Sequence, residues 1–129
     1  MADIVVIDDE PRYRRLIAQV LTGAGHEVRQ AADGAEGLAM CLRQTPQLVI
    51  TDIVMPGMEG IETILRLTRE RPGVAVLAIS GAEPASVYLR AATALGAAAS
   101  LPKPFTVDQL LRAVDALLAT APAVPAESC

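Results

Sequence analysis

Aromatic residues are almost missing from this chain of 129 residues: it has no tryptophan, and its rings are those of Tyr13, Tyr88 and Phe105. Basic residues are also few, because 11 lysines and arginines face 15 acidic residues, for a formal net charge of −4. A nucleic-acid-binding surface needs a basic stripe, usually with rings on which bases stack. Direct binding to nucleic acid is therefore not expected.

Cysteine and long apolar runs are scarce as well. The two cysteines are Cys41, inside a predicted helix, and Cys129, the last residue, so neither a disulfide framework nor a Cys-x-x-Cys metal site is expected. No stretch approaches the roughly 18 apolar residues that a membrane span needs. These absences favour a cytoplasmic protein in a reducing compartment, without membrane contact.

The composition that remains is that of one globular domain. Apolar residues make up 52% of the chain and charged residues 20%, which is too apolar for disorder, and the length suits a single core. With so few rings, that core must be aliphatic and rich in alanine. We expect the domain to span residues 1–120. Residues 121–129 contain two prolines and no periodicity, which favours a flexible tail or the start of a linker.

Strand and helix patterns alternate along the chain, which predicts an α/β fold. Apolar runs of strand length cover residues 4–7, 48–50, 74–79 and 98–101, and another strand is expected at Glu27–Ala31. Parallel strands need crossover connections, so the sheet should be doubly wound, with helices on both of its faces. Pro102 places the last strand at an edge of that sheet.

Five helices are expected to follow these strands. Prolines, glycines and N-cap residues mark their ends, which places the helices at residues 11–23, 33–45, 61–71, 85–95 and 106–120. Asp33 is the expected N-cap of the second helix, and Thr106 with Gln109 forms a capping box for the last. The apolar positions expected to face the core are Tyr13, Leu16, Ile17, Val20 and Leu21; Ala35, Leu38, Ala39 and Leu42; Ile61, Ile64 and Leu65; and Val107, Leu110, Leu111, Val114, Leu117 and Leu118.

Four of the predicted strands are followed by polar residues. Asp8 and Asp9 follow the first strand, Asp52 the third and Ser80 the fourth, and Lys103 comes just after the fifth. The carboxyl ends of parallel strands meet at one edge of the sheet, where the ligands of such folds bind. We therefore expect these side chains to lie together.

Each of these residues alone has an ordinary explanation as a helix cap, a turn former or a solvated side chain. Three carboxylates in one place, however, repel one another unless a cation compensates them. Oxygen ligands without a nearby histidine or cysteine favour Mg²⁺. A hydroxyl and an ammonium opposite that ion suit phosphoryl oxygens, so a carboxylate nucleophile and an acyl phosphate are predicted.

The motifs at these positions resemble a known family. They are Val5-Val6-Ile7-Asp8-Asp9-Glu10, Thr51-Asp52-Ile53-Val54-Met55-Pro56-Gly57-Met58-Glu59-Gly60, Ser80-Gly81 and Lys103-Pro104-Phe105. Over residues 2–119 the chain resembles the receiver domain of bacterial two-component response regulators, of the kind represented by chemotaxis regulators. The resemblance implies a flavodoxin-like three-layer sandwich with five parallel strands in the order 2-1-3-4-5. It also implies a cis peptide bond between Lys103 and Pro104.

The resemblance implies a role for each candidate residue. Asp52 would be the phosphorylation site, accepting a phosphoryl group from a histidine kinase or a phosphotransfer protein in a phosphorelay. Ser80 and Lys103 would contact the attached phosphoryl group. The ligands of Mg²⁺ would be the carboxylates of Asp8, Asp9 and Asp52. The backbone carbonyl of Val54 would be a further ligand.

One position departs from the family pattern. Many receivers carry tyrosine or phenylalanine three residues before the lysine, and this chain has Ser100 there. The ring that changes position with phosphorylation is therefore missing. Signalling would rely on Ser80 and the face made by residues 85–95, 98–101 and 106–120, or on Tyr88 as a substitute. The same face is where the family pattern allows a homodimer.

The expected function is a signalling module that phosphorylates and dephosphorylates only itself, and that switches the binding of an unidentified output partner or domain. One alternative is the N-terminal receiver of a larger DNA-binding regulator or hybrid kinase, in which residues 121–129 enter a linker. Another is a Mg²⁺-dependent phosphatase with an aspartyl-phosphate intermediate. The sequence lacks the Asp-x-Asp pattern and the cap domain expected of such an enzyme.

Overall fold

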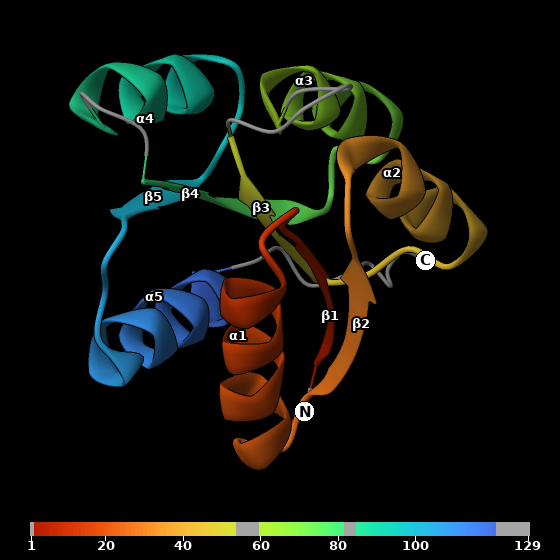
Figure 1. Cartoon of the computed structure of the whole chain (residues 1–129). Helices are drawn as coiled ribbons and strands as arrows, with labels where there is room; N and C mark the ends of the chain where they lie inside the picture. The colour runs from red at the N-terminus through yellow and green to blue at the C-terminus, as the bar shows by residue number, and fades with distance from the viewer. Residues whose placement is uncertain (1, 54–59, 82–84, 121–129) are drawn as a thin grey trace.

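The computed structural model describes residues 2–53, 60–81 and 85–120, in which strands and helices alternate (Figure 1). The elements, in chain order, are β1 (Asp3–Ile7), α1 (Pro11–Gly23), β2 (Glu27–Ala31), α2 (Gly34–Arg43), β3 (Leu48–Asp52), α3 (Gly60–Glu70), β4 (Ala75–Ser80), α4 (Ala85–Ala94), β5 (Ala99–Pro102) and α5 (Val107–Thr120). The predicted alternation is confirmed. Val54, the motif residues 55–59 and the tail at 121–129 lie outside the described residues.

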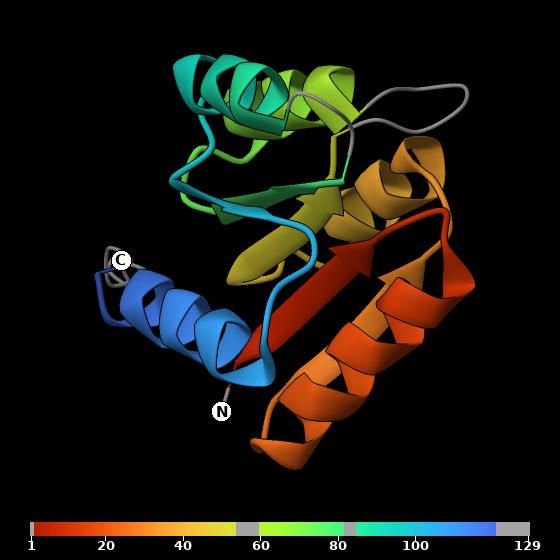
Figure 2. The ribbon, with the colours of Figure 1, turned by 60° about the vertical axis from the view of Figure 1, so that its left-hand side comes forward.

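The five strands are parallel and form one sheet in the order β2-β1-β3-β4-β5. Helices α1 and α5 cover one face of this sheet, and α2, α3 and α4 cover the other, as Figures 1 and 2 show. This is the three-layer sandwich and the strand order that the resemblance implied. β5 lies at an edge of the sheet, as Pro102 predicted, and β2 forms the other edge.

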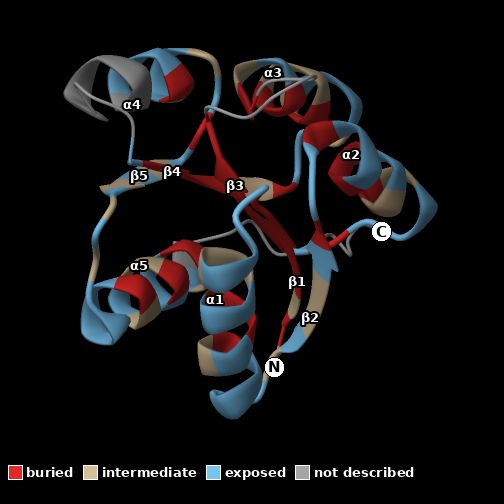
Figure 3. Ribbon diagram, viewed as in Figure 1, coloured by how far each residue is buried: buried red, intermediate tan, exposed pale blue. Residues whose placement is uncertain are grey.

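Alternate residues of the central strands face opposite sides of the sheet and build two aliphatic cores. In β1, Ile4 and Val6 belong to the core under α1 and α5, whereas Val5 and Ile7 belong to the core under α2 and α3. All five residues of β3 are buried (Figure 3). The central strands are continuous apolar runs in the sequence because helices cover both of their faces.

The buried face of α2 differs from the prediction. Ala35 and Ala39 are exposed, while Leu38 is buried and Leu42 is half-buried, as predicted. The buried residues of this helix are Gly34, Gly37, Leu38 and Cys41. A Cβ at position 37 would overlap the side chain of Ile7, so the helix approaches β1 along its glycines. This close approach, rather than the spacing of the alanines, sets the rotation of the helix about its axis.

Two other predicted core positions are exposed. Leu16 is 44% exposed, because the buried stripe of α1 runs through Ile17, Ala18 and Leu21. Val107 is 49% exposed, because it is the first residue of α5 and precedes the turn that packs on the sheet. The remaining predicted apolar positions of α1, α3 and α5 are buried or half-buried.

The predicted helix caps form. Asp33 Oδ1 accepts a hydrogen bond from the backbone N–H of Glu36 at 2.8 Å. The backbone N–H of Gln109 donates to Thr106 Oγ1 at 3.0 Å, and the backbone N–H of Thr106 donates to Gln109 Oε1 at 2.8 Å, which completes the capping box. Among the described residues, no helix has both the length and the apolar character to cross a membrane.

Candidate functional site

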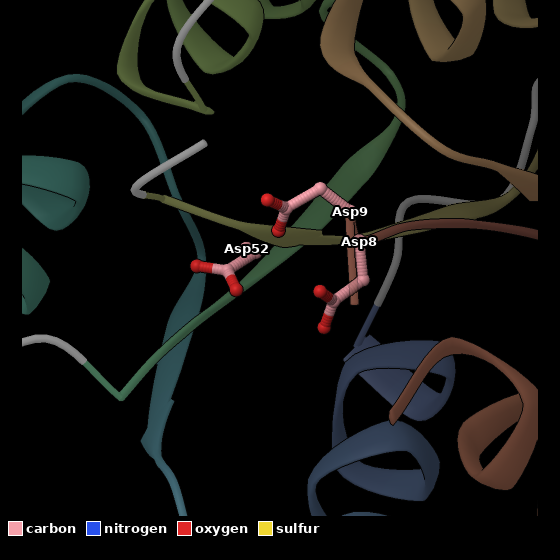
Figure 4. Close-up of side chains that lie close together, drawn as sticks. All are labelled: Asp8, Asp9 and Asp52. Atoms are coloured by element: carbon pink, nitrogen blue, oxygen red, sulfur yellow. The ribbon is translucent and has the colours of Figure 1, made fainter. Parts of the chain in front are cut away.

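Three carboxylates meet at the carboxyl edge of the sheet. Asp8 and Asp9 follow β1, and Asp52 is the last residue of the neighbouring β3. One carboxylate oxygen from each residue lies within 4.8 Å of those of the other two, and Figure 4 shows the three side chains close together. Asp8 and Asp52 are buried, whereas Asp9 is exposed. The structure therefore brings the three predicted acids together, with Asp9 on the solvent side.

The ammonium of Lys103 lies against two of these carboxylates. Its Nζ is 2.9 Å from Asp52 Oδ2 and 3.0 Å from Asp8 Oδ2, and the lysine side chain is only 9% exposed. A further carboxylate, from Glu10, lies 3.7 Å from the same Nζ. The peptide bond between Lys103 and Pro104 is cis, as the resemblance implied. Charge-assisted hydrogen bonds in a buried setting are strong, so Lys103 ties the end of β5 to the ends of β1 and β3.

Ser80 is the last residue of β4 and is fully buried. Asp52 pairs with Ile79 in the register of β3 and β4, so Ser80 lies one residue beyond Asp52 at the same edge of the sheet. The backbone carbonyl of Ser80 accepts a hydrogen bond from the backbone N–H of Lys103 at 2.9 Å. All of the described residues that the sequence predicted for the site are thus at one edge of the sheet.

Residues of the first turn of α1 support the site, and the sequence did not reveal them. Asp8 Oδ1 accepts a hydrogen bond from the backbone N–H of Glu10 at 2.9 Å, and the Asp8 carbonyl accepts one from Arg14 Nη1 at 3.0 Å. The ring of Tyr13 has its centroid 4.3 Å from Lys103 Nζ. The available signal was spacing, since residues two to six positions after Asp8 form the N-cap and the first turn of α1, next to Asp8.

Gly60 begins α3 directly against the backbone of Asp52. A Cβ at this position would overlap the Asp52 carbonyl oxygen, and the Gly60 N–H donates to the carbonyl of Ile53 at 2.8 Å. The sequence pattern puts this glycine just before the helix predicted at residues 61–71. The structure gives it a packing role, because a side chain there would displace the strand end that carries Asp52.

Burial and ion pairing set the electrostatics of the site. Burial raises the pKa of Asp8 above its ordinary value, although the Glu10 N–H and Lys103 act against it. Burial alone would lower the pKa of Lys103, but the hydrogen bonds and charges of Asp52 and then Asp8 outweigh it and raise that pKa. The ammonium therefore stays charged at neutral pH.

The charges and the donor atoms of the site fit a divalent cation. The site brings three carboxylates together with a single ammonium, and a divalent cation would offset this excess of acidic groups. All three acids offer hard oxygen ligands, which Mg²⁺ prefers. Asp9 faces solvent, which suits an ion that keeps several of its waters.

Three other predicted positions add no described contact to the site. Ser100 lies in β5 and is exposed. Val54 and the side chain of Tyr88 lie outside the described residues. The carbonyl ligand from Val54 and the substitution of Tyr88 for the missing ring therefore stay predictions.

Comparison with known proteins agrees with this geometry. The family model described as response regulator receiver domain matches residues 4–115. The chain is 36% identical over 125 residues to the transcriptional regulatory protein GlrR of Escherichia coli K12, an alignment that covers 95% of this chain and 28% of GlrR. It is 32% identical over 123 residues to protein PilH of Pseudomonas aeruginosa, covering 92% of this chain and 99% of PilH. The chain thus spans less than a third of GlrR and nearly all of PilH.

A solved structure has the same architecture. The receiver domain of NtrX from Brucella abortus is similar to this chain with a TM-score of 0.87 and 33% sequence identity, covering 92% of this chain and 99% of that one. Sequence and fold therefore point to the same family.

Proposed function

The chain belongs to the family of response regulator receiver domains, and from this membership we propose that Asp52 is its phosphorylation site. A histidine kinase or a phosphotransfer protein would donate the phosphoryl group in a phosphorelay, and the modification would change affinity for an output partner. One observation carries the proposal: the carboxylates of Asp8, Asp9 and Asp52 lie within 4.8 Å of one another, beside the ammonium of Lys103.

Asp52 is the best placed of the three acids to act as the acceptor. It ends β3, the middle strand of the sheet, so it has the acids of β1 on one side and Ser80 of β4 on the other. Asp8 is fully buried and has both oxygens engaged, by the Glu10 N–H and by Lys103. Asp9 is exposed on the solvent side. Asp52 alone can therefore face a metal ion, a hydroxyl and an ammonium together.

The proposed reaction is the direct transfer of a phosphoryl group from a phosphohistidine to the carboxylate of Asp52. A carboxylate oxygen of Asp52 attacks the phosphorus of the donor, the phosphorus–nitrogen bond of a phosphohistidine breaks, and its electron pair leaves with the imidazole. Lys103 pairs with one phosphoryl oxygen through its charge, and the Ser80 hydroxyl donates a hydrogen bond to another. The product is a mixed anhydride on Asp52, which water hydrolyses to return the carboxylate.

The same acids would hold Mg²⁺. The proposed ligands are the carboxylates of Asp8, Asp9 and Asp52 and the backbone carbonyl of Val54. A bound Mg²⁺ supplies positive charge to the phosphoryl oxygens and fixes their position relative to the acceptor. Self-phosphorylation and autodephosphorylation are the only reactions that we propose, so turnover of small phosphomonoesters such as p-nitrophenyl phosphate would contradict this assignment.

Intact-mass measurement after treatment with acetyl phosphate and Mg²⁺ tests the acceptor. We expect the wild-type chain to gain the mass of one phosphoryl group and Asp52→Asn to gain none, because an amide is not a nucleophile for this reaction. Asp115→Asn is the matched control, since it makes the same change at an exposed position of α5. An undiminished phosphorylated peak in Asp52→Asn would show that another residue is the acceptor.

The output is also a proposal. The 28% coverage of GlrR favours the N-terminal receiver of a larger transcriptional regulator, with residues 121–129 as a linker, whereas the 99% coverage of PilH favours a receiver that acts alone. The complete reading frame distinguishes the two. We further propose a cytoplasmic location and a homodimer through α4, β5 and α5. Molar mass from light scattering, before and after phosphorylation by acetyl phosphate, tests the dimer.

A further inference from the structure

Lys103 is the only lysine in the sequence, and an aromatic ring lies against its ammonium. Its Nζ is 4.3 Å from the centroid of the Tyr13 ring, which belongs to the first turn of α1. The Tyr13 ring in turn contacts the ring of Phe105, with 5.6 Å between centroids and 56° between the ring planes. An ammonium at this distance is attracted by the negative face of the ring.

Several groups compete for this ammonium. Asp8 and Asp52 contact it at 3.0 and 2.9 Å from the buried side, while the Glu10 side chain, which is 52% exposed, lies 3.7 Å away. A lysine side chain carries about 2 kcal/mol of rotamer entropy, so one contact does not fix its position. The ring of Tyr13 contacts the ammonium in the position that it takes beside the buried acids, and so adds a second kind of contact that favours this position.

A ring anchors a cation differently from a carboxylate. A carboxylate neutralises the ammonium that it holds, whereas the ring carries no net charge and leaves the charge available to another anion. At this site the other anion is a phosphoryl oxygen. The contact with Tyr13 therefore helps to hold Lys103 without adding another negative charge beside the ammonium.

We propose that Tyr13 is a positioning residue for phosphoryl transfer to Asp52, acting through Lys103; this rests on the proposed function above. With acetyl phosphate as donor, an Asp52 oxygen attacks the phosphorus, the phosphorus–oxygen bond to the acetyl group breaks, and the electron pair leaves with acetate. No proton moves to or from Lys103. The ammonium must only lie beside the transferred group, and the Tyr13 ring keeps it there.

The single lysine provides a direct measurement of the contact. Labelling the full chain with lysine carrying ¹³C at the ε position gives one side-chain resonance, that of Lys103. The ring current of Tyr13 should move the ε protons upfield from their position in free lysine. We expect this shift to persist in Tyr13→Phe and to disappear in Tyr13→Leu, which keeps an apolar side chain but has no ring.

The rate of phosphorylation by acetyl phosphate measures the consequence. We expect Tyr13→Leu to be slower by about 3- to 10-fold, the range that corresponds to one cation–π contact, and Tyr13→Phe to stay within about twofold of the wild type. The midpoint for Mg²⁺ should be unchanged, because Tyr13 is not among the proposed metal ligands and the substitution keeps the charge of Lys103. Phe105→Leu is the matched control, since it weakens the same aromatic pair without removing the ring over Nζ.

The outcomes separate positioning from packing. A wild-type rate in Tyr13→Leu overturns the proposal. A loss of rate in Tyr13→Phe or Phe105→Leu as large as that in Tyr13→Leu also overturns it. If Tyr13→Leu does not fold, phenylalanines with increasing numbers of fluorine atoms at position 13 keep the ring shape and weaken its negative face. The rate should then fall with each fluorine, and a flat series overturns the proposal. A wild-type chain that takes no phosphoryl group while the lysine shift is present refutes the proposed function instead.

Discussion

Replacing Lys103 by methionine should destabilise the chain in the absence of metal and strengthen its response to Mg²⁺. The substitution keeps an unbranched, apolar side chain that is one atom shorter, and it removes the ammonium with its charge and its hydrogen-bond donors. It leaves Asp8, which has no exposed surface, and Asp52, which is 6% exposed, without the ammonium that contacts both at 2.9 to 3.0 Å.

The expected loss follows from burial. Removing one partner of a buried ion pair costs about 3–5 kcal/mol, because a buried charge is left uncompensated. Partial protonation of Asp8, which burial already favours, limits the loss to the lower end, about 3 kcal/mol. For a domain of this size that corresponds to a fall in Tm of roughly 12 °C.

Urea unfolding in EDTA and in saturating Mg²⁺ measures both effects. In Lys103→Met the divalent cation would be the remaining compensation for the buried acids, so its dissociation constant should fall by about tenfold, which adds about 1.4 kcal/mol at a given Mg²⁺ concentration. Lys103→Arg keeps the charge and should lose less stability than the methionine variant. Arg112→Met is the matched control.

The Arg112→Met control separates the effect of burial on an ion pair from the effect of the distance between its charges. The Arg112 guanidinium lies 2.9 Å from Asp108, as close as the buried pair, but its side chain is 80% exposed, so its loss should cost less than about 0.5 kcal/mol. If Lys103→Met costs no more than Arg112→Met in EDTA, burial does not set the strength of these pairs. If Mg²⁺ stabilises the wild type and Lys103→Met equally, the lysine and the cation do not compensate the same charges.

Three further measurements test other parts of the structure. In a fluorescence or calorimetric titration, Asp9→Ala should lose more Mg²⁺ affinity than Asp8→Ala. The reason is that Asp9 faces solvent, whereas the Asp8 carboxylate already accepts hydrogen bonds from protein donors. The reverse order would contradict the ligand assignment. Burial raises the pKa of Cys41 from 9.0 to about 11, so the native state keeps a proton that the unfolded chain loses. The free energy of unfolding should therefore fall by about 1.4 kcal/mol more in the wild type than in Cys41→Ala between about pH 8 and pH 10, and equal slopes would show that the thiol is not buried. Thr106→Ala should cost about 1 kcal/mol in urea unfolding through loss of the capping box, with no change in the rate of phosphorylation.

The sequence predicts the part of the site that depends only on topology. Asp8, Asp52 and Ser80 each end an apolar run of strand length, and parallel strands bring such ends together whatever the details of packing. The capping box at Thr106 and the N-cap at Asp33 are equally predictable, because both depend on residues within one turn of each other. The order of the strands came from resemblance, and alternation alone does not set it.

The parts that the sequence missed depend on how closely elements approach. Ala35 and Ala39 have the spacing of a buried face, but the absence of a side chain at Gly37 lets α2 turn another face toward β1. Tyr13 reaches Lys103 only because α1 and the end of β5 lie next to each other in space. Such contacts between residues distant in the sequence leave no periodic signal along the chain.

Lys103 connects the stability of the unmodified domain to the chemistry proposed at Asp52. Its ammonium is shared between Asp52 and Asp8, and its backbone N–H is bonded to the Ser80 carbonyl. A phosphoryl group on Asp52 would change the anion that this ammonium faces, so the change would act first on the residue that joins the ends of β4 and β5. The chain has Ser100 rather than a ring in β5, so we expect an effect on the neighbouring surface to start from these backbone and ionic contacts.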